Sequence, residues 1–245
     1  MPISQRIIKK LLHFIFKYLF TYEVKGMEHY PDKDEQVVIM ANHQSFLDVA
    51  LLTYIFPEKL TFPINVDISR LWWVRLVLAV SPNKVFPLDT ANPLAVRNLI
   101  KHVKDNPQER TCIFPEGRIT KTGRLMKMYE GAGMIADKTG AKLLCVRIDG
   151  AEFSMLSRTR GILPRRWFPH LKVTIYPAEE LKVKKDLVGR SRRREIGNQI
   201  TDMMIEAEFN SVDLERPIFK AVLDSVERFG LGHQVMKDPI RGSFT

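Results

Sequence analysis

The chain has 245 residues, enough for one large domain or two small ones with a sizeable core. Its formal net charge of +10 favours an acidic partner, which would be an anionic lipid, an acidic carrier protein or nucleic acid. Two cysteines, both inside apolar strand-like runs, exclude a disulfide framework and indicate buried thiols in a reducing compartment.

The first predicted element is a helix over residues 5–20, QRIIKKLLHFIFKYLF, in which basic residues recur at helical spacing and apolar residues fill the rest. Lysines interrupt the apolar run, whereas a bilayer span needs ~20 mostly apolar residues. No small-residue cleavage site follows, so a secretory signal is not expected. We predict an amphipathic helix, residues 1–21, lying on an anionic membrane surface. The alternative is a helix packed on the protein's own core, with its lysines reaching solvent.

Residues 41–48, ANHQSFLD, follow the apolar run VVIMA, which reads as a buried strand. The pattern places His43 in a turn and Asp48 in the first turn of a helix that runs from about residue 46 to 56. A carboxylate that holds one imidazole nitrogen makes the other a general base. The alternative is a helix cap, with Ser45 at the N-cap and Asp48 three residues on, and both can hold at once.

Residues 114–120, FPEGRIT, follow a second buried strand and carry Glu116, Gly117 and Arg118. Arginine suits bidentate phosphate binding, although a solvated Pro-Glu-Gly turn is the alternative. In open α/β sheets, ligands bind outside the carboxyl ends of the strands. The two polar loops are therefore expected to face one site.

Alternating helix and strand patterns predict an α/β fold, with a mainly parallel central sheet flanked by helices. The expected strands cover residues 22–25, 60–65, 85–88, 111–114 and 142–148, with an edge strand over 171–176, and the expected helices cover 68–80, 93–103 and 186–208. The helix over 68–80 contains Trp72 and Trp73, which fit a membrane interface and core burial equally. The predicted domain spans 22–210, and 211–245 reads as a carboxy-terminal segment or linker.

Basic residues are concentrated between residues 158 and 194, where twelve lysines and arginines face three acidic residues. Several such residues would hold a domain on an anionic membrane, at ~1 kcal/mol each. A dock for a carrier protein and a solvated charge run are the alternatives. Nothing resembling an RNA-reading motif or zinc finger accompanies the charge, so nucleic acid is not an expected partner.

The pattern N-H-x-x-x-x-D, followed about seventy residues later by F-P-E-G, resembles the glycerophospholipid acyltransferase family over roughly residues 20–180. The resemblance implies catalysis by His43 with Asp48. It also implies substrate binding by residues of the family motifs. In this chain those positions are Asn42, Thr90, Glu116, Gly117 and Arg118.

The chain departs from the family pattern at two positions: Thr90 stands where an arginine is expected, and Cys145 stands where a proline is usual. A hydroxyl does not replace a bidentate phosphate clamp, so a diester acceptor such as a lysophospholipid fits better than a phosphate monoester. FPLD, FPEGRIT and LMKMYEGAGMIA most resemble the amino-terminal domain of bacterial two-domain acyl-carrier-protein synthetase/2-acylglycerophosphoethanolamine acyltransferases. That resemblance implies that an adenylate-forming ligase domain can follow in the natural protein.

These observations predict a lysophospholipid O-acyltransferase that uses an acyl thioester of acyl-carrier protein or coenzyme A and needs no metal or cofactor. The acceptor would be a lysophospholipid such as 2-acylglycerophosphoethanolamine, and backbone donors near Gly117 would meet the oxyanion. The expected location is the cytoplasmic face of a bacterial inner membrane. The alternatives are a 1-acylglycerol-3-phosphate acyltransferase that makes phosphatidic acid and, in another class, a non-catalytic membrane-binding module.

Overall fold

The computed structural model describes residues 3–70, 83–89, 94–159 and 161–211, together with 223, 226, 236–238 and 242–244. Most of the helix predicted over 68–80 and the whole of Thr90 lie outside these ranges. The chain divides into two compact units, Met1–Glu208 and Phe209–Thr245. The second unit contains a short antiparallel hairpin, and its strands are β8 (Met236–Asp238) and β9 (Gly242–Phe244).

The first unit is built on a seven-stranded sheet of order β1-β7-β6-β2-β5-β3-β4. Its strands are β1 (Tyr22–Lys25), β2 (Val37–Ala41), β3 (Leu60–Asn65), β4 (Lys84–Leu88), β5 (Arg110–Ile113), β6 (Lys142–Asp149) and β7 (Leu171–Ile175). All neighbours are parallel except β6 and β7. The prediction of an edge strand over 171–176 is wrong, because β7 lies between β6 and β1 and the short β1 forms the edge.

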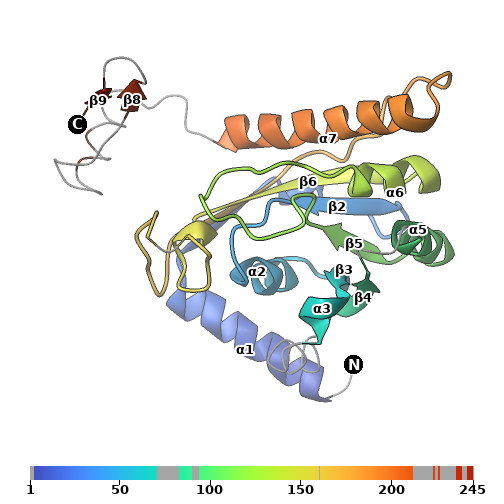
Figure 1. Cartoon of the computed structure of the whole chain (residues 1–245). Coiled ribbons are helices and arrows are strands. Elements are labelled where there is room, and N and C mark those ends of the chain that lie inside the picture. The colour runs from blue at the N-terminus through green and yellow to red at the C-terminus, as the bar shows by residue number, and fades with distance from the viewer. Residues whose placement is uncertain are drawn as a thin grey trace. The chain divides into compact units, whose positions relative to one another are not determined.

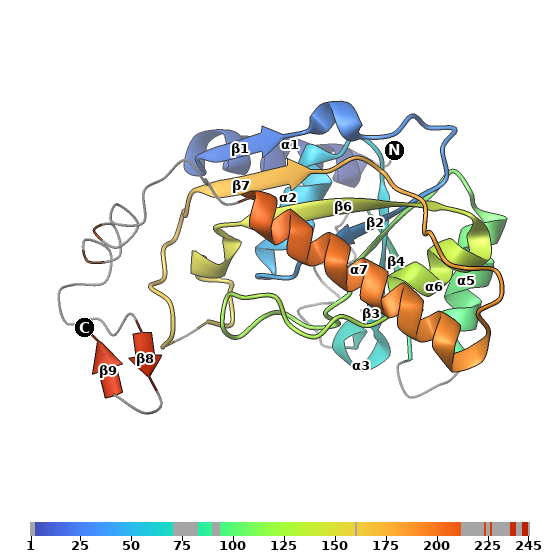
Figure 2. The same ribbon diagram turned by 90° about the horizontal axis from the view of Figure 1, so that it is seen from above.

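Helices cover both faces of this sheet, as Figure 1 shows. They are α1 (Ile3–Leu19), α2 (Leu47–Ile55), α3 (Val66–Ser69), α5 (Ala95–Asp105), α6 (Gly131–Thr139) and α7 (Gly189–Ser211). The helices α1 and α2 lie on one side of the sheet, and α5, α6 and α7 lie on the other (Figures 1 and 2). The predicted α/β fold with a central sheet flanked by helices is confirmed.

The central strand β2 shows why its sequence is uniformly apolar. Val37, Ile39 and Ala41 face the core that α1 and α2 cover. Val38 and Met40 face the opposite core, against α5, α6 and α7. Because both faces are covered, alternate side chains are all buried, and the run VVIMA carries no polar residue.

The amino-terminal helix α1 packs on the protein's own core along one side. Phe16 is fully buried and stacks on Tyr54 next to α2's end, with ring centroids 5.0 Å apart. Phe14 and Tyr18 are exposed. The core-packing alternative is therefore correct for one face, and contact of the other face with a membrane stays a prediction. Within the described residues, no helix combines the length and apolarity that a membrane span requires.

The two cysteines are free thiols buried in different cores, as the sequence predicts. Cys112 lies in the core under α1 and α2, and Cys145 lies in the core under α5, α6 and α7. Burial raises the pKa of the Cys145 thiol to about 12. Both thiols are therefore protonated and inert near neutral pH.

Candidate active site

The two polar loops follow the carboxyl ends of neighbouring strands and are hydrogen-bonded to each other. The strands that precede them, β2 and β5, are parallel neighbours, with Met40 opposite Ile113. The backbone N–H of His43 donates to Oε1 of Glu116 at 2.9 Å, and the carbonyl of His43 accepts from the N–H of Thr120 at 2.9 Å. The two loops therefore lie in direct contact, as expected, although they lie some seventy residues apart in the sequence.

Asp48 fixes both the imidazole and the start of α2. Its Oδ2 accepts from Nδ1 of His43 at 2.9 Å and from the backbone N–H groups of Gln44 at 2.6 Å and Ser45 at 2.9 Å. The hydroxyl of Ser45 in turn accepts from the N–H of Leu47 at 2.8 Å. The histidine–aspartate pair therefore exists together with the Ser45–Asp48 bonds expected at the helix start, because one buried carboxylate oxygen serves both. The helix itself begins one residue later than predicted, with Phe46 and not Ser45 as its N-cap residue.

The imidazole of His43 is held on one side and open on the other. Its ring stacks on Phe114, with centroids 4.0 Å apart and planes inclined by 14°. The side chain is 16% exposed, and Nε2 makes no hydrogen bond to any residue that the structure describes. With Nδ1–H donated to Asp48, Nε2 presents a lone pair, which is the arrangement that a general base requires.

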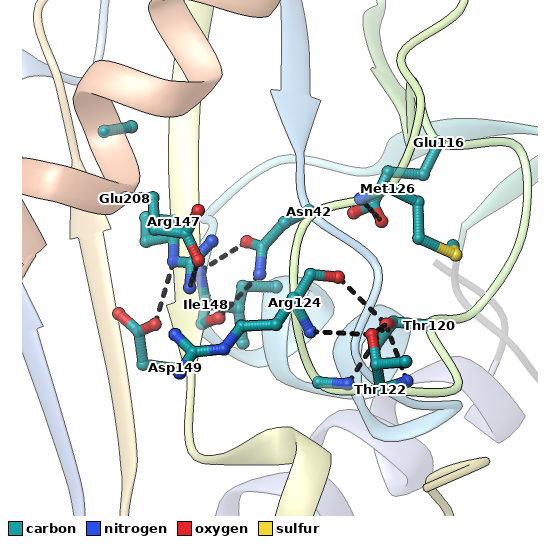
Figure 3. Close-up of polar contacts among 12 residues, drawn as sticks. Asn42, Glu116, Thr120, Thr122, Arg124, Met126, Arg147, Ile148, Asp149 and Glu208 are labelled. Atoms are coloured by element: carbon teal, nitrogen blue, oxygen red, sulfur yellow. Dashed lines mark hydrogen bonds and ion pairs between the residues drawn. The ribbon is translucent and has the colours of Figure 1, made fainter. Parts of the chain in front are cut away.

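Glu116 is a buried brace for the histidine turn. Its side chain is only 1% exposed, and its second oxygen, Oε2, accepts from the N–H of Met126 at 3.1 Å (Figure 3). Burial raises the pKa of the carboxyl group, and the N–H groups of His43 and Met126 act against that shift. The predicted contact of Glu116 with substrate is not supported, because both oxygens bond to backbone within the protein.

Asn42 also lies behind the site. Its side chain is fully buried, and its amide exchanges two hydrogen bonds of 2.7 Å with the backbone N–H and carbonyl of Ile148 in β6 (Figure 3). Because the side chain is fully buried and its amide group bonds to β6, the structure does not support the predicted direct contact of Asn42 with substrate. The side chain instead ties the end of β2 to its neighbouring strand and supports the turn that carries His43.

Gly117 and Arg118 are the exposed part of the FPEGRIT loop. Gly117 adopts a φ of +67°, which favours glycine, and its N–H donates to the carbonyl of Phe114 at 3.0 Å. That donor is thus used within the turn, and the expectation that backbone donors near Gly117 meet the oxyanion stays a prediction. Arg118 makes no hydrogen bond or ion pair with any described residue, so its guanidinium remains available to an anion.

Thr120 is a structural residue of the site that sequence reasoning missed. Its hydroxyl donates to the carbonyl of Arg124 at 2.9 Å and accepts from the N–H of Gly123 at 3.1 Å (Figure 3). These bonds fold the loop back on itself while the N–H of Thr120 holds His43. Threonine followed by a glycine three residues later is a turn signal that could have found it.

A second polar cluster lies at the carboxyl end of β6, where Arg147 is buried and its two carboxylate partners are partly exposed. The guanidinium of Arg147 bonds to Asp149 at 2.8 Å and to Glu208 at 3.3 Å (Figure 3). Burial raises the pKa of nearby Glu152 to about 7. Among the described residues, no three histidines, cysteines or carboxylates gather in a way that could hold a metal ion.

Comparison with known proteins gives one consistent family. The model of the family named Acyltransferase matches residues 21–149, a range that contains both loops. The chain is 30% identical over 170 residues to the chloroplastic 1-acyl-sn-glycerol-3-phosphate acyltransferase BAT2 of Brassica napus, covering 63% of this chain and 47% of that protein. It is 29% identical over 132 residues to the human 1-acyl-sn-glycerol-3-phosphate acyltransferase alpha, covering 51% and 44%. The chain thus spans about half the length of these relatives.

A solved structure shares the fold. It is the 1-acyl-sn-glycerophosphate acyltransferase PlsC of Thermotoga maritima, which is 21% identical and superposes with a TM-score of 0.56 over 82% of this chain and 79% of that one. The family match, which covers more than half of the chain and both loops of the site, decides the assignment. This chain therefore belongs to the Acyltransferase family.

Proposed function

We propose that this protein transfers a fatty acyl group from a thioester to the free glycerol hydroxyl of a lysophospholipid, such as 2-acylglycerophosphoethanolamine. The observation that carries the proposal is a pair of hydrogen bonds to the backbone of His43. Its N–H donates to Glu116, and its carbonyl accepts from Thr120. These bonds hold an imidazole with an open Nε2 beside the loop that carries Arg118, whose guanidinium makes no bond to any residue that the structure describes.

The reaction follows from these positions. Nε2 of His43 takes the proton of the acceptor hydroxyl while its oxygen attacks the thioester carbonyl carbon, and Asp48 stabilises the imidazolium that forms. When the tetrahedral intermediate collapses, the carbon–sulfur bond breaks and the imidazolium proton passes to the departing thiolate. The products are the acylated lipid and the free thiol of acyl-carrier protein or coenzyme A, and the protein returns to its starting protonation.

The positive charge near the site favours an acceptor with a single negative charge. Arg118 supplies one exposed guanidinium, which makes no bond to any described residue and is open to the lipid phosphate. The second arginine of the family pattern is replaced by Thr90, which lies outside the described residues. A single clamp suits a phosphodiester with one negative charge better than a monoester with nearly two.

A second candidate acceptor is 1-acylglycerol-3-phosphate, which would give phosphatidic acid. It is favoured by the relatives, which are named 1-acyl-sn-glycerol-3-phosphate acyltransferases. Rates with lysophosphatidate and lysophosphatidylethanolamine, measured with the same labelled acyl thioester, separate the two. A clear preference for lysophosphatidate would overturn the assignment of a diester acceptor.

The donor, membrane partner and location complete the proposal. The net charge of +10 suits both an acidic acyl-carrier protein and the anionic cytoplasmic face of a bacterial inner membrane. Parallel assays with acyl-carrier-protein and coenzyme A thioesters identify the donor. If the wild-type protein transfers no acyl group from either donor and still binds liposomes, as does His43→Ala, the non-catalytic membrane module becomes the better account.

A further inference from the structure

Residues 117–129, which continue from the FPEGRIT turn, carry exposed positive charge beside the catalytic turn. The segment contains no aspartate or glutamate. Arg118, which the proposed function assigns to the acceptor, is followed by three more exposed cations. We call the segment the basic loop, and these three cations are Lys121, Arg124 and Lys127. Among the described residues, neither Lys121 nor Arg124 has a side-chain hydrogen bond or ion pair.

The basic loop is folded back on itself. At its tip, the hydroxyl of Thr120 donates to the carbonyl of Arg124 at 2.9 Å. At its base, the ring of Tyr129 lies 3.5 Å from the position that a Cβ on Gly117 would take. Nζ of Lys127 lies 5.6 Å from the centre of the same ring. The two limbs of the loop therefore lie side by side, which brings the three cations onto one short stretch of surface.

Both limbs are tied to the residue that carries the imidazole. In the first limb, the N–H of Thr120 donates to the carbonyl of His43 at 2.9 Å. In the second limb, the N–H of Met126 donates to Oε2 of Glu116 at 3.1 Å, while Oε1 of Glu116 accepts from the N–H of His43 at 2.9 Å. A partner bound by the basic loop is thus held next to the catalytic turn.

The tip of the loop offers charged side chains and not a cradle of backbone donors. The N–H groups of Thr122 and Gly123 donate to the hydroxyl of Thr120, at 3.3 and 3.1 Å (Figure 3). The N–H of Arg124 donates to the hydroxyl of Thr122 at 3.4 Å. Phosphate pockets use free backbone N–H groups of this kind, and here those of the tip are occupied. Long cationic side chains on an open surface suit a partner whose acidic charge is spread over a face.

The exposed side of the loop is also poor in apolar side chains. Ile119 is buried, and Leu125 and Met128 pack against the core under α5, α6 and α7. Within the described segment 117–129, Tyr129 is the one large apolar side chain that is exposed. A surface that binds a bilayer combines cations with apolar side chains that enter the acyl-chain region. The basic loop lacks this combination, so an acidic protein fits it better than a membrane does.

From these observations we infer that the basic loop docks the acidic face of an acyl-carrier protein, so that the thioester on the carrier's prosthetic arm reaches His43. Opposite charges across such an interface steer the encounter and fix the orientation of the partner. The inference rests on the proposed function in taking the donor to be an acyl thioester. It names the donor protein and the surface that receives it.

The basic residues at the start of α7 are less well placed for this role. The helix has 23 residues, and its far end lies by the carboxyl end of β6, where Glu208 bonds to Arg147 at 3.3 Å. Arg190 stands eighteen residues before Glu208, about 27 Å away at ~1.5 Å per residue. Arg192 is already paired with Asp137. A carrier docked there would have to bridge that length as well.

The docking is tested by binding of holo-acyl-carrier protein to the full chain, measured by fluorescence anisotropy at low and at moderate ionic strength. The charge-reversal variant Lys121→Glu/Arg124→Glu/Lys127→Glu is expected to bind about tenfold more weakly or worse, and added salt should weaken binding to wild type. The variant that keeps the charges, Lys121→Arg/Arg124→Lys/Lys127→Arg, should bind like wild type. Thermal melting checks that each variant folds.

A matched control makes the same change of net charge on α7. It reverses three exposed arginines, as Arg190→Glu/Arg193→Glu/Arg194→Glu, and it should bind the carrier like wild type. In acyl-transfer assays, charge reversal in the basic loop should raise KM for the carrier thioester by about tenfold, as charge pairs across an interface are lost. It should leave KM for the same acyl group on coenzyme A unchanged.

Carrier binding that is equal in wild type and loop variant, or that the α7 variant weakens as much, would overturn the inference. So would an equal rise in KM for both donors, because the loop would then recognise the arm that they share. Loop-dependent binding to phosphatidylglycerol vesicles, with no binding of carrier, would overturn it in favour of a membrane. Transfer from coenzyme A without carrier binding would refute the inference alone, whereas loop-dependent carrier binding without transfer from either donor would refute only the proposed function.

Discussion

Two histidines of this protein each lie against a carboxylate, and they lie at opposite ends of the parallel strands. His43 follows the carboxyl end of β2, with Nδ1 2.9 Å from Oδ2 of Asp48. His102 lies in the last turn of α5, with Nε2 3.3 Å from Oε2 of Glu109, which directly precedes the amino end of β5. By residue type and distance the two pairs are similar, and by surroundings they are not.

Glu109 belongs to an ion-pair network, because Lys84 and Thr61 bond to the same carboxylate. Burial acts to raise its pKa, and the hydrogen bonds from Lys84 and Thr61 outweigh burial and hold the pKa below its usual value. Asp48, in contrast, accepts only N–H groups of its own turn and of His43. A histidine–carboxylate pair therefore indicates catalysis only under two conditions. The second imidazole nitrogen must be free of protein partners, and the pair must lie at the carboxyl ends of the strands, where ligands bind.

The sharpest way to break this comparison is to remove each imidazole in turn. His43→Ala should lower kcat/KM for acyl transfer by roughly 10²–10⁴-fold, the usual contribution of general-base catalysis. His102→Ala should leave the rate unchanged. Thermal melting of both variants checks that they fold. An equal loss of activity in the two would contradict the claim that only the His43 pair is catalytic.

The partner carboxylates extend the test. Asp48→Asn should reduce kcat by about 10²-fold or more, since a neutral amide neither stabilises the imidazolium nor enforces the tautomer. The fold should persist, because the amide oxygen can still accept from Gln44 and Ser45. Glu109→Gln should lower the melting temperature without changing kcat. A normal rate in Asp48→Asn would remove the aspartate from the mechanism.

The sequence predicted the frame of the molecule well, because continuous apolar runs such as VVIMA and KLLCVRI require a strand covered on both faces. It misplaced β7, since strand order depends on long-range pairing that no local pattern records. The partner of β7 on the outer side is β1, whose four residues, Tyr22–Lys25, carry little signal of their own. The pair of His43 and Asp48 was predictable, because its spacing sets a turn against the first turn of a helix.

The directions of Asn42 and Glu116 could not be predicted from the same motifs. A sequence motif does not distinguish an exposed glutamate that binds substrate from a buried glutamate that holds a turn in place. Only the position of the N–H groups of His43 and Met126 shows that Glu116 faces the protein. For Asn42 the deciding partner is Ile148, which lies more than a hundred residues away.

The brace formed by Glu116 gives an effect of intermediate size. Glu116→Gln places an amide NH₂ against one of two backbone donors, so the turn that carries His43 should shift. We expect kcat to fall by about 10–10²-fold, as a small misplacement of a catalytic group costs up to that much, with KM for the acceptor unchanged. A raised KM with normal kcat would restore the substrate contact predicted from the sequence.

Arg118 should give the opposite signature. Arg118→Ala should raise KM for the lysophospholipid by about tenfold, because a hydrogen bond to a charged group contributes about 1.5–3 kcal/mol, and it should change kcat little. The control is Arg97→Ala, an exposed arginine of α5 far along the chain from both loops. If both variants raise KM alike, general surface charge and not a phosphate contact is responsible.

The smallest effect concerns stability. Because burial raises the pKa of Glu152 from 4.5 to about 7, the folded protein holds a proton that the unfolded chain has lost between these values. Stability should therefore fall as the pH rises from 4.5 to 7, and Glu152→Gln should remove that fall and gain about 1–3 kcal/mol at pH 8. Urea unfolding at pH 5 and pH 8 measures the difference, and a pH-independent gain would show that ionisation is not its cause.

The most direct test of the shared site is chemical modification of His43 in the presence of acceptor. Diethylpyrocarbonate should modify His43 at a rate that matches the loss of acyl transfer, as peptide mass spectrometry resolves it from the other five histidines. Lysophospholipid should protect His43 in the wild-type protein and fail to protect it in Arg118→Ala at the same concentration. Modification of His43 that lysophospholipid does not slow, or protection that survives the loss of Arg118, would contradict a single site that binds the acceptor phosphate and activates its hydroxyl.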